Sequence, residues 1–92
     1  MVEQTATYVA ECFWPGVTDS DLELLDQRVE LAVAGLAPPV RYLGAILIRE
    51  DEVVLCQFEG TSDAVHAAAT RAAVPYARII ETTQSLRRRV DD

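Results

Sequence analysis

The sequence contains no lysine, and its eight basic residues, all arginines, are outnumbered by fifteen aspartates and glutamates. The formal net charge is −7. A protein that binds nucleic acid needs a basic face to neutralise phosphates, so this composition argues against a DNA or RNA partner. The one basic cluster, Arg87 to Arg89, is offset by Asp91 and Asp92, and we expect it to be a solvated part of a polar tail over 84–92.

Long apolar runs are also missing from the chain. No segment approaches the ~20 apolar residues that a membrane-spanning helix requires. The first residues, MVEQTATY, lack the basic start and apolar centre of a secretory signal. We therefore expect a cytoplasmic protein without a membrane partner, and a length of 92 residues indicates a single domain over 1–92.

The residue types that most often carry chemistry are scarce. His66 is the only histidine, and its lack of an obvious partner leaves no Ser-His-Asp set. The four glycines are scattered and form no phosphate-binding loop. Cys12 and Cys56 lack CxxC spacing and are interpreted as buried, reduced thiols, with a disulfide or a metal-thiolate pair as alternatives. The sequence identifies no reaction and no cofactor.

Strand and helix signals alternate along the chain. Stretches rich in β-branched and aromatic residues predict strands over 5–14, 40–49, 53–59 and 77–83. Ser20 and Glu23 have capping-box spacing at the start of a helix that ends before Pro38. A second helix is predicted from about Ser62 to Ala73, with a narrow apolar stripe made of Ala64, Val65, Ala68, Ala69 and Ala72. The order β-α-β-β-α-β predicts an α+β ferredoxin-like plait, in which a four-stranded antiparallel sheet with strand order 4-1-3-2 carries both helices on one face.

The strands are apolar on both faces. A sheet covered on one side only should alternate apolar and polar residues. In the second strand, however, Tyr42, Ile46 and Ile48 share one parity while Leu43, Ala45 and Leu47 share the other. A chain this short has nothing left to cover the second face, so we expect a homodimer through the helix-free face of the sheet.

Polar residues interrupt these apolar strands at a few positions. Glu11, Arg41, Gln57 and Glu59 are the candidate ligand-binding residues, because a few polar groups among aliphatic walls are typical of a small-ligand site. Arg49 and Glu81 belong to the same polar set. The alternative is that these charges pair across strands and only fix the register. Glu11 lies inside its strand, and we expect it to face a cavity and orient a bound ligand, with Arg41 or Gln57 nearby.

Residues 8–16, YVAECFWPG, and 40–81 resemble a family of small bacterial ferredoxin-like proteins of unknown function that is associated with nickel binding. The positions that fit the family pattern are Glu11, Pro15, Gly16, Cys56, Phe58, Glu59, Pro75, Arg78 and Ile79. The resemblance implies a ferredoxin-like fold and a dimer. The chain departs from the family where a helix histidine is replaced by Ala68, a strand serine by Ala45 and a helix-end glycine by Ala73, so we expect weak or absent nickel binding and assign no metal ligands.

These observations favour a non-enzymatic dimeric α+β binding protein for a metal ion or a small ligand. One alternative is a cofactor-independent enzyme similar to the muconolactone isomerase and antibiotic-biosynthesis monooxygenase type of dimer. Such an enzyme would have its pocket between sheet and helices, and Glu11 is the one candidate here for acid-base chemistry. A protein-interaction module is the other alternative.

Overall fold

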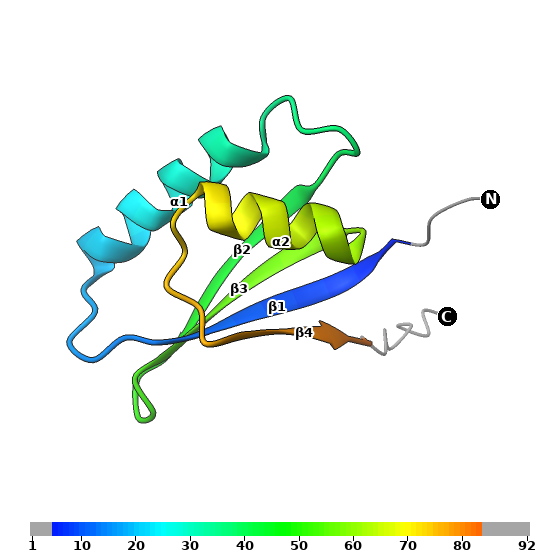
Figure 1. The fold of residues 1–92 in the computed structure, drawn as a ribbon. Helices are drawn as coiled ribbons and strands as arrows, with labels where there is room; N and C mark the ends of the chain where they lie inside the picture. The colour runs from blue at the N-terminus through cyan, green and yellow to red at the C-terminus, as the bar shows by residue number, and fades with distance from the viewer. Residues whose placement is uncertain (1–4, 84–92) are drawn as a thin grey trace, which may run out of the picture.

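A computed structural model of the protein describes residues 5–83 (Figure 1). The elements follow the predicted order, with bounds close to those expected from the sequence. They are β1 (Ala6–Phe13), α1 (Asp19–Val33), β2 (Arg41–Ile48), β3 (Val53–Gly60), α2 (Ser62–Arg71) and β4 (Arg78–Thr82). The predicted tail over 84–92, with the Arg87–Arg89 cluster, lies outside the described residues.

The four strands form one antiparallel sheet in the order β2-β3-β1-β4, which is the predicted strand order. Both helices lie on the same face of this sheet, and among residues 5–83 no helix covers the other face (Figure 1). The fold is therefore the α+β ferredoxin-like plait. Within residues 5–83, no helix is long and apolar enough to cross a membrane.

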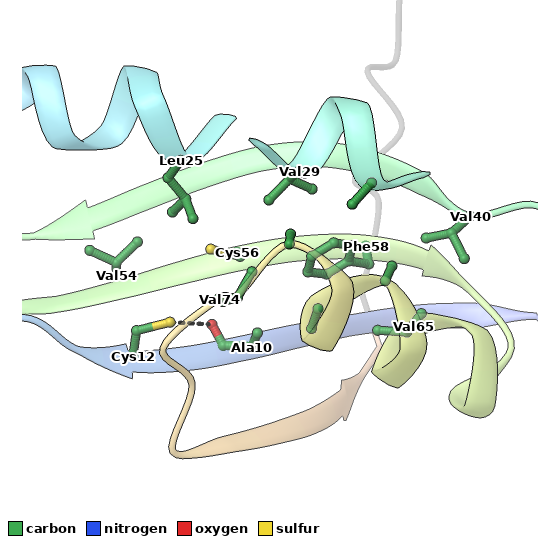
Figure 2. Packing of buried hydrophobic residues seen from close by; sticks show 14 of the residues in the cluster. Ala10, Cys12, Leu25, Val29, Val40, Val54, Cys56, Phe58, Val65 and Val74 are labelled. Carbon is green, nitrogen blue, oxygen red and sulfur yellow. Dashed lines mark hydrogen bonds between the residues drawn. The ribbon is translucent and has the colours of Figure 1, made fainter. Parts of the chain in front are cut away.

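The core fills the layer between the sheet and the two helices (Figure 2). Leu25 and Val29 of α1 and Phe58 of β3 are fully buried there. The predicted stripe of α2 faces the same core, and each of its five members is at most 7% exposed. Because most of these side chains are alanines, α2 can lie close to the strands and leave little unfilled volume.

Helix α1 begins two residues earlier than the Ser20 capping box predicts. Thr18 is the N-cap: its Oγ1 accepts a hydrogen bond from the Asp21 backbone N–H at 3.1 Å. In return, the Asp21 carboxylate accepts from the Thr18 N–H at 2.9 Å. The predicted pairing of Ser20 with Glu23 is wrong because Thr18 and Asp21 form the box two positions earlier.

Helix α2 ends in a tight turn. The N–H groups of Ala73 and Val74 donate to carbonyl groups of the last helical turn at 3.0 Å, and Ala73 has a left-handed backbone with φ of 56°. This is the Schellman pattern, in which glycine is the usual residue because it has no Cβ. Arg28 of α1 also reaches this turn. Its Nε donates to the Ala72 carbonyl at 3.0 Å and its Nη2 to the Ala73 carbonyl at 3.4 Å.

Strand β2 contains a β-bulge that the sequence pattern did not predict. Tyr42 pairs with Phe58 and Gly44 pairs with Gln57, so Leu43 between them has no partner on β3. An inserted residue of this kind reverses the alternation of side chains that follows it.

The bulge corrects the predicted faces of β2. Tyr42 packs against the core, and so do Ala45 and Leu47, which simple alternation would place on the other face from Tyr42. Ile46 and Ile48 lie on the helix-free face, and Arg41 shares that face with them. The grouping predicted from simple alternation is therefore wrong for this strand, although apolar side chains do occupy both faces of the sheet.

Candidate functional site

The candidate site lies on the helix-free face, where the strand register arranges the side chains in rows. Residues of β1 and β3 that alternate with the core residues point to this face. Across β4, β1, β3 and β2, in that order, the rows are Phe13, Val53 and Ile48; Arg78, Glu11, Leu55 and Ile46; Ile80, Val9, Gln57 and Gly44; and Thr82, Thr7, Glu59 and Arg41. All four candidate residues from the sequence, Glu11, Arg41, Gln57 and Glu59, lie on this face.

A hollow of about 270 Å³ opens in the middle of these rows. Gln57 is its central polar residue. The remaining lining residues are aliphatic or carry a hydroxyl: Thr7, Val9, Ile46, Leu55, Thr82 and Thr83. The volume lies just below the usual range of pockets for drug-sized ligands, so the hollow suits a small molecule.

Gly44 helps to keep this region open. It stands opposite Gln57 in the register, so no side chain covers Gln57 from β2. A Cβ placed on Gly44 would meet no atom within 4 Å, but the φ of 112° is a conformation that residues with a Cβ rarely adopt. Backbone conformation, rather than lack of space, therefore favours glycine at this position.

Glu11 lies in the row beside the hollow but is not one of its lining residues. Its carboxylate accepts a hydrogen bond from Arg78 Nε at 2.8 Å, and its side chain is 24% exposed. The hydrogen bond that Arg78 donates to Glu11, and then the negative charge of Glu11, raise the pKa of Arg78. Glu11 is thus paired across the strands with β4, and neither Arg41 nor Gln57 is its ionic partner.

Arg41 and Glu59 pair with each other at one end of the face. Arg41 Nη1 lies 3.0 Å from Glu59 Oε1, and the two residues stand directly opposite in the register. Their row contains Thr7, which lies four residues from Glu11 along β1, about 13 Å at ~3.3 Å per residue. The structure therefore divides the four candidates into a polar residue inside the hollow and two separate ion pairs around it.

Arg49 and Glu81 do not join this face. Arg49 follows β2 in the turn and forms a 3.3 Å ion pair with Asp19 of α1. Glu81 stands opposite Tyr8, whose side chain packs against the core, so Glu81 belongs to the helix side of the sheet. Arg49 lines a second hollow of about 170 Å³ near Gly16, where Glu52 already accepts a hydrogen bond from the Gly16 N–H at 3.1 Å.

The two cysteines belong to the core and are not part of the hollow. Cys12 and Cys56 are free thiols with no exposed surface, in agreement with the predicted buried, reduced state (Figure 2). A hydrogen bond to Cys12 and burial raise the pKa of the Cys56 thiol. A thiol that stays protonated is a weak nucleophile, so Cys56 is a structural residue.

A buried hydroxyl lies beside these thiols. Tyr42 donates a hydrogen bond to the Asp26 carboxylate of α1 at 2.5 Å, and its ring lies 5.4 Å from that of Phe58. Burial, followed by the hydrogen bond to Asp26, raises the pKa of Tyr42 well above its usual range. The contact ties α1 to the sheet.

The described residues offer no assembled metal site. His66 is exposed to solvent on α2, and its Nδ1 lies 2.9 Å from the Ser62 carbonyl oxygen. Within residues 5–83, no group of three or more histidines, cysteines, aspartates and glutamates is close enough to hold a metal ion.

Sequence reasoning missed several residues of this face. Arg78 was noted for the family resemblance, but its pairing with Glu11 depends on the β1–β4 register, which the sequence does not give. Thr7 and Thr82 lack any distinctive motif. Gly44 is the sequence feature that could have indicated the bulge, since a glycine inside an apolar strand often marks a bulge or a close approach of another backbone.

With this geometry, the chain has the architecture of a small α+β ferredoxin-like protein with an open sheet face. No known protein-family model and no curated protein matches the chain. Among solved structures, it is similar to the crystal structure of SCO4226 from Streptomyces coelicolor A3(2), with a TM-score of 0.73 and 21% sequence identity. The match covers 88% of this chain and 100% of that chain. At this level of identity the similarity shows a shared fold and does not extend to a nickel association.

Proposed function

We propose that this protein is a non-enzymatic homodimeric binding protein, in which the helix-free sheet faces of two copies pack together over a small ligand. The observation that carries the proposal is the apolar character of this face around a hollow with a single central polar residue. Phe13, Ile46 and Ile48 are 66%, 49% and 38% exposed in one subunit. Large apolar side chains gathered on one face commonly mark an interaction surface.

The size of the face supports a second copy as its cover. Three strands of eight residues and one of five, spaced ~4.8 Å apart, give a flat footprint of roughly 450 Å². Side-chain relief increases the accessible area above this value. A specific interface of standard size buries about 800 Å² on each partner, which is of the same order.

The charges of the face are compatible with this packing. Glu11 pairs with Arg78, and Glu59 pairs with Arg41, so each carboxylate already has a partner within its own subunit. A buried charge is costly unless it is paired and hydrogen-bonded. In the proposed dimer, Gln57 contacts the ligand, while the two ion pairs border the site and limit which ligands enter.

No specific observation favours either of the two alternative functions, a cofactor-independent enzyme or a pure interaction module. An enzyme of the related dimeric type needs a pocket between sheet and helices, and core side chains fill that layer here. Glu11 lies on the opposite face. A pure interaction module would use the same apolar surface without the hollow, and it is the reading that remains if no ligand binds.

Nickel is not part of the proposed function. Ala68, fully buried in the core stripe of α2, stands where the resembling family carries a histidine. The hollow presents an amide and hydroxyls instead of the imidazoles and thiolates that nickel favours. We also propose a cytoplasmic location, which the two free thiols support because reducing compartments preserve them.

Sedimentation equilibrium at micromolar concentration tests the dimer. We expect twice the subunit mass of 10.1 kDa for the unchanged protein. Ile46→Arg should give the subunit mass, because it places an unpaired charge within the proposed interface. Leu24→Arg is the matched control, since Leu24 is 56% exposed on α1, away from the sheet face.

Circular dichroism should show a folded chain for both variants. The proposal fails if the unchanged protein sediments as a subunit of 10.1 kDa, or if Leu24→Arg dissociates the dimer and Ile46→Arg does not.

A further inference from the structure

The hollow on the helix-free face has a chemical character that narrows the ligand further. Every side chain of residues 5–83 that lines it is uncharged. Val9, Ile46 and Leu55 provide aliphatic walls, and Gln57 lies among them with an amide that can both donate and accept. A site of this composition recognises an apolar body that carries one hydrogen-bonding group.

The charged residues nearby are occupied with each other. The Glu11 carboxylate is held by Arg78 at 2.8 Å, and the Glu59 carboxylate by Arg41 at 3.0 Å. Neither pair lines the hollow. A charged ligand entering it would lose its hydration without gaining an opposite charge, which is costly in a site closed by a second subunit.

The polar groups inside the hollow are not equally available. The Thr82 hydroxyl already donates to the Thr7 carbonyl at 3.1 Å. Among the hydrogen bonds of residues 5–83, none uses the side chains of Gln57, Thr7 or Thr83, and Gly44 opposite Gln57 adds no covering side chain. Of these three side chains, only Gln57 carries two N–H donors and a separate carbonyl acceptor. Gln57 is therefore the lining residue best placed to bind a polar group of a ligand.

We propose that the hollow binds a small uncharged organic molecule with an aliphatic or alicyclic body and one carboxamide-like group, which pairs with the Gln57 amide. This inference rests on the proposed binding function and adds the chemical class of the ligand. An amide partner can satisfy the donor and the acceptor of Gln57 together, whereas a carboxylate, an ammonium or a metal ion can satisfy only one of them.

Nuclear magnetic resonance of nitrogen-labelled protein provides a direct test. The chain contains four glutamines and no asparagine, so the side-chain amide region is simple and the Gln57 signal is identified by its loss in Gln57→Leu. The probes are cyclohexanecarboxamide, cyclohexanecarboxylate, cyclohexylammonium and nickel chloride. We expect the carboxamide to shift the Gln57 side-chain amide saturably, and the two organic ions to bind at least several-fold more weakly.

Three variants sharpen the test. Gln57→Leu should weaken carboxamide binding about fivefold, which corresponds to one hydrogen bond of ordinary strength. Gln57→Glu keeps the shape and should reverse the preference toward cyclohexylammonium. Gln27→Leu, at an exposed position of α1, should leave all affinities unchanged.

The outcomes separate this inference from the proposed function. If sedimentation gives a dimer but the carboxamide leaves the Gln57 signal unmoved, or the carboxylate binds equally well, the ligand class is wrong and the dimer stands. If nickel chloride selectively perturbs the Gln57 signal, an uncharged ligand is the wrong class. A monomer in sedimentation overturns the proposed function itself.

Discussion

On the helix side of the sheet, Cys12, Cys56 and Phe58 have no exposed surface, whereas on the other side Ile46 and Phe13 are 49% and 66% exposed. Side chains of the two sides alternate along the strands, and large apolar residues occur on both sides. The helix side is closed because α1 and α2 supply complementary side chains (Figure 2). The opposite side also carries large apolar side chains, but within residues 5–83 no helix or loop covers them (Figure 1).

The comparison teaches that hydrophobicity in a strand does not by itself define the core. Stability of the single chain should depend on the helix side, and association should depend on the helix-free side. The following predictions test this division, from the largest expected effect on stability to the smallest.

The first prediction compares one residue from each face. Phe58→Ala should lower the free energy of unfolding by about 3–5 kcal/mol, because it removes a fully buried ring and leaves a cavity. Ile46→Ala removes a half-exposed side chain and should cost about 1 kcal/mol within one subunit. Urea denaturation at several protein concentrations measures both effects.

The dependence on concentration provides the internal control. For Ile46→Ala, the destabilisation should grow with protein concentration, since its side chain belongs to the proposed interface. Phe58→Leu keeps the chain folded if alanine proves too disruptive. Equal effects from the two faces at all concentrations would contradict the division.

The second prediction concerns the hydroxyl that joins the sheet to α1. Tyr42→Phe removes the hydrogen bond to Asp26 and should cost about 1–2 kcal/mol at neutral pH, because a partly buried carboxylate loses its donor. Tyr76→Phe is the control on the same side of the sheet. Denaturation by urea at pH 7 measures the difference.

The same contact predicts a pH dependence. The pKa of Tyr42 is raised in the folded state by burial and by Asp26, and the unfolded value is about 10. The stabilisation from the neutral hydroxyl is therefore complete below about pH 10 and decreases as the pH rises further. Above that pH, the unchanged protein should lose stability faster than Tyr42→Phe, and parallel curves would refute the assignment.

The third prediction concerns the ion pair beside the hollow. Glu11→Gln should leave the fold and the melting temperature almost unchanged, because glutamine can still accept from Arg78 and an exposed ion pair contributes little. It should change selectivity, since the charge of Arg78 is no longer neutralised. The affinity ratio between cyclohexanecarboxamide and cyclohexanecarboxylate should fall, as measured by the same titrations.

Glu81→Gln is the control for this third prediction, because Glu81 lies at an exposed position on the helix side of the sheet. An unchanged ratio in Glu11→Gln would remove Glu11 from the candidate site and leave Gln57 as its polar centre.

The sequence was sufficient for the element order, the strand order and the apolar stripe of α2, because these depend on local patterns and on few topological choices. The sequence was insufficient where a single inserted residue changes which face of the sheet the following side chains occupy. Leu43 has no partner on β3, and this bulge moves Ile46 and Ile48 to the helix-free face. Alternation alone cannot locate such a bulge, although Gly44 is a hint.

The candidate site was predictable in composition but not in arrangement. Glu11, Gln57 and Glu59 lie on the helix-free face because parity within β1 and β3 is regular, and Arg41 lies there because it precedes the bulge of β2. Their partners depend on cross-strand register, which sets Arg78 beside Glu11 and Arg41 beside Glu59. The hollow around Gln57 arises from side chains of all four strands and has no signature in any one of them.

The contact between Arg28 and the end of α2 has a consequence for how the helix layer opens. Two carbonyl groups of the turn that contains the strained Ala73 receive hydrogen bonds from a residue of the other helix. If α1 detaches, this turn loses those donors while keeping its left-handed residue, so α2 should fray at once. The amide protons of the two helices should therefore exchange with solvent together, as one cooperative unit formed by segments more than forty residues apart.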